Sequence, residues 1–308
     1  MPCVKNVLTD AAGSLQSISD SAMLEAEILL SLALGADRSY LRAWPERTVQ
    51  EPACQHFLAL LKKRQEGVPI AYITGFREFW SKSFIVTPDV LIPRPETELL
   101  VELSLELIAP GAPFNIVDLG TGSGIIAICL ATERPESTIV ASDISAAALE
   151  VAQRNADRHE VAHIRFCLSD WFSMIPNERY SLIVSNPPYI AENDDHLCQG
   201  DVRFEPRSAL CAKDAGLHAI ASIADQARRY LEPGGHLLIE HGYNQESPVQ
   251  ALFRQFDYQN IKTFYDLSGQ PRVSYGQKTS RTRRYDHHPP GNLIKFQPDV
   301  TFFSKQQT

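Results

Sequence analysis

The chain has 308 residues, of which 44% are hydrophobic and 21% are charged. This composition is ordinary for a globular protein, and the length allows two domains with separate cores. The net charge of −8 does not favour a general nucleic-acid-binding surface, although it leaves a local basic patch open. No apolar run approaches the roughly 20 residues that cross a bilayer, and the first ten residues lack the apolar segment of a signal peptide. We therefore expect a cytoplasmic protein without membrane contact.

The six cysteines are scattered and form no C-x-x-C pair, so neither a zinc site nor a disulfide framework is expected. Cys129 and Cys167 lie in apolar patterns and are interpreted as small buried hydrophobic residues. The adjacent His287 and His288 fall in a polar stretch, where a solvated pair is more common than a metal ligand. We expect no metal.

Residues 1–70 are predicted to form a small helical domain. Residues 21–34 are rich in helix formers and stop at Gly35, and residues 51–65 carry a proline in their first turn. Neither helix holds a group of catalytic side chains. We therefore expect this domain to recognise the substrate rather than to perform chemistry.

Residues 71–92 are expected to form a β-hairpin connector, because aromatic and β-branched residues are interrupted by glycine and serine. The following segment, Ile92-Pro-Arg-Pro-Glu-Thr-Glu98, leads into a predicted helix that runs to Leu107. Arg94 stands between two prolines on a stiff segment. It is either a solvated arginine or a group aimed at an active site.

Residues 93–277 alternate between strand and helix patterns. Strands are predicted at 114–119, 138–142, 164–168, 180–185, 236–240, 261–265 and 272–275, and helices at 125–133, 146–158, 217–231 and 248–256. This alternation indicates an α/β fold with a doubly wound, mainly parallel sheet and helices on both faces. Ligands of such sheets bind at the carboxyl ends of the strands. Residues 278–308 lose the pattern and are predicted to be a flexible tail.

A glycine-rich loop, Asp118-Leu-Gly-Thr-Gly-Ser-Gly124, joins the first of these strands to a helix. Three glycines at alternate positions allow the backbone to approach a ligand closely. The dinucleotide fingerprint would need its third glycine where Ile125 stands, and the Gly-Lys-Ser/Thr ending of a phosphate-binding P-loop is absent. The ligand therefore need not carry a phosphate.

Acidic and aromatic residues follow the next two strands. Asp143 lies at the spacing where an acid accepts ribose hydroxyls, although it could instead be a helix N-cap before Ser145. Trp171, next to Asp170, could border an adenine ring or simply pack in the core.

The stretch Asn186-Pro187-Pro188-Tyr189 follows the strand at 180–185. Two prolines cannot continue a sheet ladder and fix a stiff turn, from which an amide and an aromatic ring leave in defined directions. A proline-rich loop without function is one interpretation. The other is a polar clamp for a planar group that bears nitrogen. A nucleoside ligand without phosphate, next to such a clamp, points to S-adenosylmethionine.

The glycine loop and the Asn186-Pro-Pro-Tyr189 turn together resemble the class I, seven-stranded methyltransferases that modify planar nitrogens. The chain is most similar to the bacterial peptide chain release factor glutamine methyltransferase family over about residues 22–276. The further matches are Arg77-Glu-Phe-Trp80, Ile92-Pro-Arg-Pro-Glu-Thr-Glu98, Ser169-Asp-Trp-Phe172 and Gln199-Gly-Asp-Val-Arg-Phe-Glu-Pro206.

The resemblance implies transfer of a methyl group from S-adenosylmethionine to the glutamine side chain of the Gly-Gly-Gln motif in class I release factors. It implies that Asn186 and the Pro187 carbonyl accept the substrate N–H groups, that Tyr189 packs beside the amide, and that Pro188 stiffens the clamp. The cofactor residues that it implies are Gly120, Thr121, Gly122, Ser123, Gly124, Asp143, Trp171 and Asn186. Asp118 supports the loop or meets the amino group of the cofactor.

Three other functions stay open at this point. An adenine-N6 DNA methyltransferase uses nearly the same turn, but usually adds a basic recognition region. The acceptor could also be a glutamine in another protein. A non-catalytic cofactor-binding scaffold is the third alternative, and the intact motifs speak against it. A monomer without direct nucleic-acid contact is the default expectation.

Overall fold

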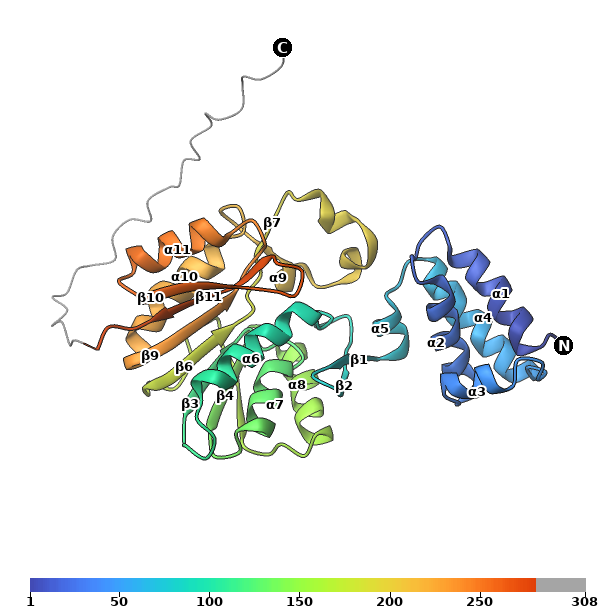
Figure 1. Cartoon of the computed structure of the whole chain (residues 1–308), viewed down its shortest axis with the longest axis horizontal. Coiled ribbons are helices and arrows are strands. Elements are labelled where there is room, and N and C mark those ends of the chain that lie inside the picture. Colours follow the sequence, from blue (N-terminus) through green and yellow to red (C-terminus); the bar gives the residue numbers. More distant parts are fainter. Residues whose placement is uncertain (281–308) are drawn as a thin grey trace, which may run out of the picture.

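The computed structural model describes residues 1–280. It shows a helical domain and a larger sheet domain, which are joined by a short connector (Figure 1). The predicted tail at 278–308 lies outside the described residues from residue 281 onward.

The helical domain contains four helices around its own core. They are α1 (Val4–Leu15), α2 (Ala22–Leu34), α3 (Arg38–Ala43) and α4 (Glu51–Gln65). The predicted helices at 21–34 and 51–65 are confirmed. The left-handed Gly35, with φ +62°, ends α2 because only glycine adopts this conformation without a Cβ penalty. Phe57 of α4 and Leu29 and Leu30 of α2 are fully buried in the core.

The connector consists of a short helix and the predicted hairpin. The helix α5 (Ile70–Thr74), which the sequence pattern did not reveal, leads into β1 (Phe76–Phe79) and β2 (Lys82–Ile85). Trp80 and Ser81 form the two-residue turn, both with positive φ, as the right-handed twist of a hairpin favours. Asn155 of the sheet domain binds both backbone groups of Ile85, which fixes the hairpin to that domain.

The sheet domain is built on seven strands in the order β10-β11-β9-β6-β3-β4-β5. Their bounds are β3 (Asn115–Leu119), β4 (Thr138–Asp143), β5 (Ile164–Leu168), β6 (Tyr180–Ser185), β9 (Leu231–Glu240), β10 (Gln259–Tyr265) and β11 (Pro271–Gln277). Only β11 runs antiparallel to its neighbours. The predicted doubly wound, mainly parallel sheet is confirmed.

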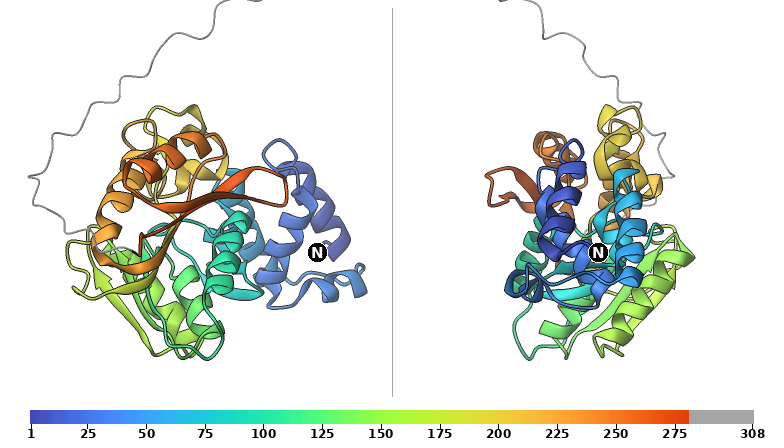
Figure 2. Two further views of the ribbon diagram at one scale, coloured as in Figure 1. Left: turned by 60° about the vertical axis from the view of Figure 1, so that its left-hand side comes forward. Right: turned by 90° about the vertical axis from the view of Figure 1, so that its right-hand side faces the viewer.

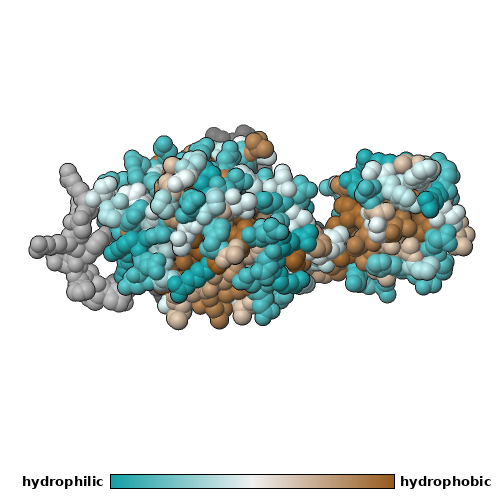
Figure 3. Space-filling view, turned by 90° about the horizontal axis from the view of Figure 1, so that it is seen from below, coloured by the Kyte–Doolittle hydropathy of each residue, from teal (hydrophilic) through white to brown (hydrophobic). Residues whose placement is uncertain are grey.

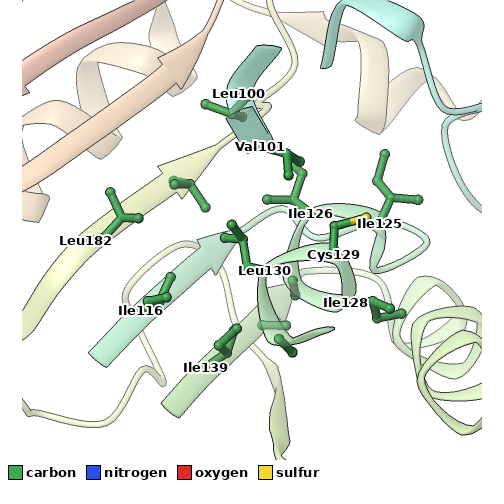
Figure 4. Packing of buried hydrophobic residues seen from close by; sticks show 14 of the residues in the cluster. Leu100, Val101, Ile116, Ile125, Ile126, Ile128, Cys129, Leu130, Ile139 and Leu182 are labelled. Carbon is green, nitrogen blue, oxygen red and sulfur yellow. The ribbon is translucent and has the colours of Figure 1, made fainter. Parts of the chain in front are cut away.

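Helices cover both faces of this sheet (Figure 2). They are α6 (Glu98–Leu107), α7 (Ile125–Glu133), α8 (Ala146–Arg158), α10 (His218–Tyr230) and α11 (Glu246–Gln255). Neighbouring residues of one strand point to opposite faces, so Ile116 packs with α6 and α7, whereas Val117 packs with α10. Figure 4 shows the first of these layers, with Leu100 of α6 and Leu130 of α7 over Ile116 and Leu182.

Two parts of the sheet domain differ from the sequence prediction. The strand β9 begins at Leu231 rather than at residue 236, because Pro233-Gly234-Gly235 continues the strand through an irregular register instead of only ending the helix. The region between β6 and α10 also holds short elements that were not predicted. They are β7 (Ile190–Ala191), η2 (Asp195–Cys198), η3 (Gly200–Phe204), α9 (Arg207–Leu210) and β8 (Cys211–Ala212).

The surface of the helical domain carries a hydrophobic area on the side that faces the sheet domain (Figure 3). The helical domain also has exposed apolar residues on α2, where Leu24 and Leu32 lie about two turns apart. Within residues 1–280, no helix combines the length and the apolar character needed to cross a bilayer.

Candidate active site

The sheet register brings the predicted motifs together at one edge. Leu119 of β3 pairs with Ser142 of β4 on one side and with Ser185 of β6 on the other. The segments that follow these residues are the glycine loop, Asp143 and the Asn186 turn, so all three start side by side. The Ser185 hydroxyl donates to the Leu119 carbonyl at 2.8 Å and ties two of these strand ends together.

A cavity of about 240 Å³ opens at this edge. Its lining includes most of the predicted cofactor residues and Pro188 of the predicted clamp, together with residues from the stretch 89–97 and from α9. The predicted cofactor residues are Gly120, Thr121, Gly122, Ser123, Asp143, Trp171 and Asn186, and the other residues include Asp89, Leu91, Arg94, Thr97, Ser208 and Ala209.

The glycine loop is shaped by left-handed backbone at Gly120 and Gly122, with φ +70° and +55°. A Cβ at Gly122 would meet no protein atom within 4 Å, so a side chain there would project from the loop into open space. The loop is braced from β4, because Thr121 N–H donates to Ser142 O at 2.8 Å and Gly122 N–H donates to Asp143 Oδ2 at 2.9 Å. These bonds hold the loop in a shape in which the backbone of Gly120 and Gly122 is open to a ligand.

Gly124 does not line the cavity. It begins α7 with φ +83°, and a Cβ there would approach the Ala152 and Ile128 side chains to 3.1 Å. Its glycine therefore lets α7 pack closely against α8. A role in cofactor binding stays a prediction for this residue.

Asp118 is fully buried below the loop. Thr121 Oγ1 donates to its Oδ2 at 2.6 Å, whereas its Oδ1 has no hydrogen-bond partner among the described residues. Burial raises the pKa of the Asp118 carboxyl to about 7, against the opposing hydrogen bonds from Thr121 and Ala127. The structure thus gives Asp118 the loop-supporting contact of the two that were expected.

Asp143 stands between the glycine loop and α8. Its Oδ2 accepts from Gly122 N–H and its Oδ1 from Ser145 N–H, both at 2.9 Å. It is not the helix N-cap, because the Ser145 side chain fills that place by accepting from Ala148 N–H. Each carboxylate oxygen keeps a free lone pair for a hydroxyl donor. Burial raises the pKa of Asp143 above its usual value.

Trp171 forms the wall opposite the glycine loop. A Cβ at Gly120 would lie 3.6 Å from its ring. Its φ of +46° is uncommon for a bulky residue, and Ser169 Oγ stabilises the turn by donating to Trp171 O at 2.8 Å. The Trp171 ring therefore packs close to the glycine loop and, as part of the cavity lining, offers a flat apolar surface to a ligand.

Asn186 lies at the cavity, and its Nδ2 donates to Thr97 Oγ1 at 3.1 Å. The amide oxygen of Asn186 accepts no hydrogen bond from the other described residues. Pro187 is buried and Tyr189 is half-buried, and neither is part of the cavity lining. The prolines therefore set the exit direction of the turn, while Asn186 and Pro188 face the cavity.

Three residues near the turn were not found by sequence reasoning. Thr97, which lies in the predicted Ile92–Glu98 segment, contacts Asn186 directly. Glu240 ends β9, and the pairing of Ile239 with Ser185 places it beside Asn186. An acidic residue at the carboxyl end of a neighbouring strand was the available signal. Gln245 donates from Nε2 to Tyr189 O at 3.0 Å.

Arg94 does face the active site and is paired rather than solvated. It lines the cavity and forms an ion pair with Glu205, which is also bound by Ile92 N–H at 2.9 Å. The 192–210 segment, which carries η2, η3 and α9, is thereby fixed to the edge of the cavity. In residues 1–280, no cluster of three or more His, Cys, Asp or Glu side chains is arranged to hold a metal ion.

Two family models match the chain. Residues 96–201 match the Methyltransferase small domain, and residues 6–75 match the PrmC N-terminal domain. A curated relative from Salmonella typhimurium, named release factor glutamine methyltransferase, is 46% identical over 261 residues, which cover 85% of this chain and 94% of the relative. The chain belongs to the release factor glutamine methyltransferase family.

Other relatives agree with this assignment. The release factor glutamine methyltransferase of Vibrio cholerae is 47% identical over 86% of this chain and 93% of its own length. A solved methyltransferase from Pyrococcus furiosus has a TM-score of 0.50 at 14% identity and covers 72% of this chain and 98% of its own. At that identity it supports the fold alone. For a member of the release factor glutamine methyltransferase family, the adjoining glycine loop and Asn186 turn form the candidate active site.

Proposed function

We propose that the protein methylates the side-chain amide nitrogen of the glutamine in the Gly-Gly-Gln motif of class I peptide chain release factors. Its family membership supports the enzyme class and the acceptor. The observation that carries the proposal in this chain is the position of Asn186, at the cavity and beside the glycine loop. Cofactor and acceptor amide can meet only where these two motifs adjoin.

The methyl donor of this reaction is S-adenosylmethionine, which supplies a methyl group on a cationic sulfur and is already a strong electrophile. The cavity fits this group in three respects. The loop at Gly120–Gly122 offers bare backbone to its amino-acid end, Asp143 keeps lone pairs for the ribose hydroxyls, and Trp171 offers a flat face to adenine.

The chain's own contribution is orientation. An amide nitrogen is a poor nucleophile, because its lone pair is delocalised into the carbonyl. In this proposal the Asn186 Oδ1 and the Pro187 carbonyl accept its two N–H groups, which turns the lone-pair face toward the methyl carbon. Pro188 stiffens the turn and Tyr189 packs beside the amide. Orientation of this kind can contribute roughly 7–11 kcal/mol.

The bond changes balance without a further co-reactant. The acceptor nitrogen gains the methyl carbon, the carbon–sulfur bond breaks with its electron pair on sulfur, and one N–H proton leaves to solvent. A strong general base is not required before transfer, because the electrophile is already activated.

The helical domain is proposed to bind the release factor away from the glutamine. The hydrophobic area in Figure 3 supports this role. Unchanged affinity for the release factor in a folded chain that lacks residues 1–70 would contradict it.

The test of the proposed function is mass spectrometry of the Gly-Gly-Gln peptide after incubation of a release factor with this protein and S-adenosylmethionine. A gain of one methyl group on the glutamine is expected. Cofactor binding by calorimetry, together with an unmodified glutamine, would reject the proposed acceptor.

The Asn186→Ala variant tests the clamp itself. It is expected to bind S-adenosylmethionine as the wild type does but to lose at least about 100-fold in turnover, because both an acceptor and the orientation disappear. Asn115→Ala is the matched control, since Asn115 is exposed at the opposite end of the sheet. Near-wild-type turnover of Asn186→Ala would reject the clamp.

A further inference from the structure

A line of buried polar groups lies behind the Asn186 turn. Asn186 Nδ2 donates to Thr97 Oγ1 at 3.1 Å, and Tyr189 donates from its hydroxyl to Glu240 Oε1 at the long distance of 3.5 Å. Thr97 and Glu240 are each 1% exposed, and the Thr97 hydroxyl is close enough to the Glu240 carboxyl to oppose the rise of its pKa, while Glu240 Oε2 accepts no hydrogen bond from the described residues. Glu240 is not part of the cavity lining, so any effect on the substrate passes through its neighbours.

The amide of Asn186 poses an orientation problem. Its oxygen and its NH₂ group have nearly the same shape, but only the oxygen can accept a substrate N–H. The Thr97 hydroxyl can either donate or accept, so Thr97 alone does not determine which end of the amide faces it.

An ionised carboxylate resolves this ambiguity because it only accepts hydrogen bonds. When the hydroxyl proton of Thr97 is directed to Glu240, the Thr97 oxygen has only lone pairs left for Asn186. The NH₂ group of Asn186 must then face Thr97, and its oxygen must face the acceptor. Tyr189 donates to the same carboxylate. Glu240 therefore influences Asn186 at the start of the turn and Tyr189 at its end.

We propose that Glu240 is a positioning residue, which acts through Thr97 to fix the amide orientation of Asn186 that the substrate needs. The inference rests on the proposed clamp role of Asn186. It adds Thr97 and Glu240, which come from separate elements, to that clamp.

The surroundings of Glu240 make this device dependent on pH. Burial raises the pKa of the Glu240 carboxyl to about 7, opposed by Thr97, Arg272 and Tyr189 and assisted by the negative charge of Glu96. Arg272 comes from β11, Glu96 from η1 (Pro95–Thr97), and Tyr189 from the turn after β6. A protonated Glu240 can donate to Thr97, which releases the constraint on Asn186. Turnover should therefore decrease as the pH falls below about 7.

The test compares Thr97→Val, Thr97→Ser and Glu240→Gln on full-length protein, with a release factor as acceptor. We expect kcat to fall about tenfold or more in Thr97→Val and Glu240→Gln, as for loss of one oriented hydrogen bond. The KM for S-adenosylmethionine should stay within about twofold. Thr97→Ser keeps the hydroxyl and should retain most of the activity. Thr132→Val makes the same chemical change on the exposed side of α7 and serves as the control.

Two further readouts separate positioning from a merely structural role. The double variant Thr97→Val with Glu240→Gln should be no slower than the slower single variant, because both substitutions remove the same constraint on the Asn186 amide. The wild-type kcat should fall as the pH is lowered below about 7. The kcat of Glu240→Gln should not show this fall.

Full activity of Thr97→Val, additive losses in the double variant, or an unchanged pH profile in Glu240→Gln would each overturn the proposal. Failure of the wild type to methylate the release factor would instead reject the proposed function, so the two failures are distinguishable.

Discussion

At the scale of single residues, the active site concentrates buried acidic groups. Asp118 is the last residue but one of β3 and Glu240 ends β9, the two strands on either side of β6. Both are at most 1% exposed, and each has one oxygen without a hydrogen-bond partner in the described part of the chain. Burial of such groups costs stability when they are ionised. Asp118 offsets part of this cost by bracing the glycine loop through Thr121, and Glu240 by accepting a hydrogen bond from Tyr189 of the turn.

Because burial of the Asp118 carboxylate is unfavourable, we predict that the stability of the protein depends on pH. Its pKa is raised from 3.8 in a free side chain to about 7, so the folded chain holds this proton more tightly than the unfolded chain. The free energy of unfolding therefore decreases as the pH rises from about 4 to about 7. Relative to the wild type, Asp118→Asn should gain about 2–3 kcal/mol between pH 5 and pH 8. Urea unfolding at both pH values measures this gain.

The control for this prediction is Asp157→Asn, which changes an exposed carboxyl of α8. Its stability should follow the wild type across the same range. If the free energy of unfolding of Asp118→Asn changed with pH in the same way as that of the wild type, the raised pKa of Asp118 would be contradicted.

At the scale of elements, the Asn186 turn is held from behind by the loop that precedes α10. Gln245 Nε2 donates to Tyr189 O at 3.0 Å and to Ala215 O at 3.2 Å. Gly216, with φ +84°, lies so close that a Cβ there would approach Tyr189 O to 2.0 Å. The backbone of one loop thus fits directly against the backbone of the turn.

This close fit predicts that Gly216→Ala lowers activity more than stability alone explains. The variant should lose about 1–2 kcal/mol from left-handed backbone, and it must also displace the turn. Gly269→Ala is a matched control, because it has φ +74° but nothing within 4 Å of its Cβ. Thermal unfolding and turnover measured on both variants should show similar strain but a large kcat loss only in Gly216→Ala. Equal turnover would show that the turn tolerates the displacement.

At the scale of the whole molecule, the 192–210 segment connects the two domains. Arg64 of α4 is buried and binds Glu25 at 2.8 Å within the helical domain and Asp201 of η3 at 2.9 Å. The same segment is held at its other end by Arg94 through Glu205. Ser208 and Ala209 of this segment line the cavity, so the helical domain reaches the active site through one continuous stretch of chain.

Loss of this connection should be visible in both domains. Arg64→Ala leaves the half-buried Glu25 without its partner and is expected to lower the free energy of unfolding by about 1–3 kcal/mol. Hydrogen exchange of residues 200–204 should also become faster. Arg42→Ala, whose side chain is 66% exposed, is the control and should change stability by less than about 0.5 kcal/mol. Unchanged exchange in Arg64→Ala would show that Arg94 alone holds the segment.

The regular part of the fold could be predicted because its periodicity and its glycine and proline signals agree. The helices at 125–133 and 146–158 and the strands at 164–168 and 180–185 were confirmed to the residue. The motifs of the site could be predicted because each follows a predicted strand. The short helix α5 and the small elements at 190–212 could not, because each is too short to show a period and depends on contacts with distant residues such as Arg64 and Arg94.

The partners of Asn186 were missed for a different reason. Thr97 and Glu240 are separated from it by 89 and 54 positions in sequence, and only the strand order and register bring them together. The hydrogen-bond partners of a polar residue at the end of a strand can be predicted only when the neighbouring strand is known. Sequence patterns identify such residues one at a time, whereas their hydrogen bonds depend on the sheet.

The position of β11 also determines the order in which the sheet can be completed during synthesis. β11 lies between β10 and β9, although it is the last strand to be made among those in residues 1–280. Until residues 271–277 have left the ribosome, the edge of β9 at Glu240 has no partner, and a nascent chain exposes unpaired backbone beside the Asn186 turn. A chain shortened before residue 271 would therefore lose the outer partner of β9 and expose an unpaired strand edge that can pair with other chains.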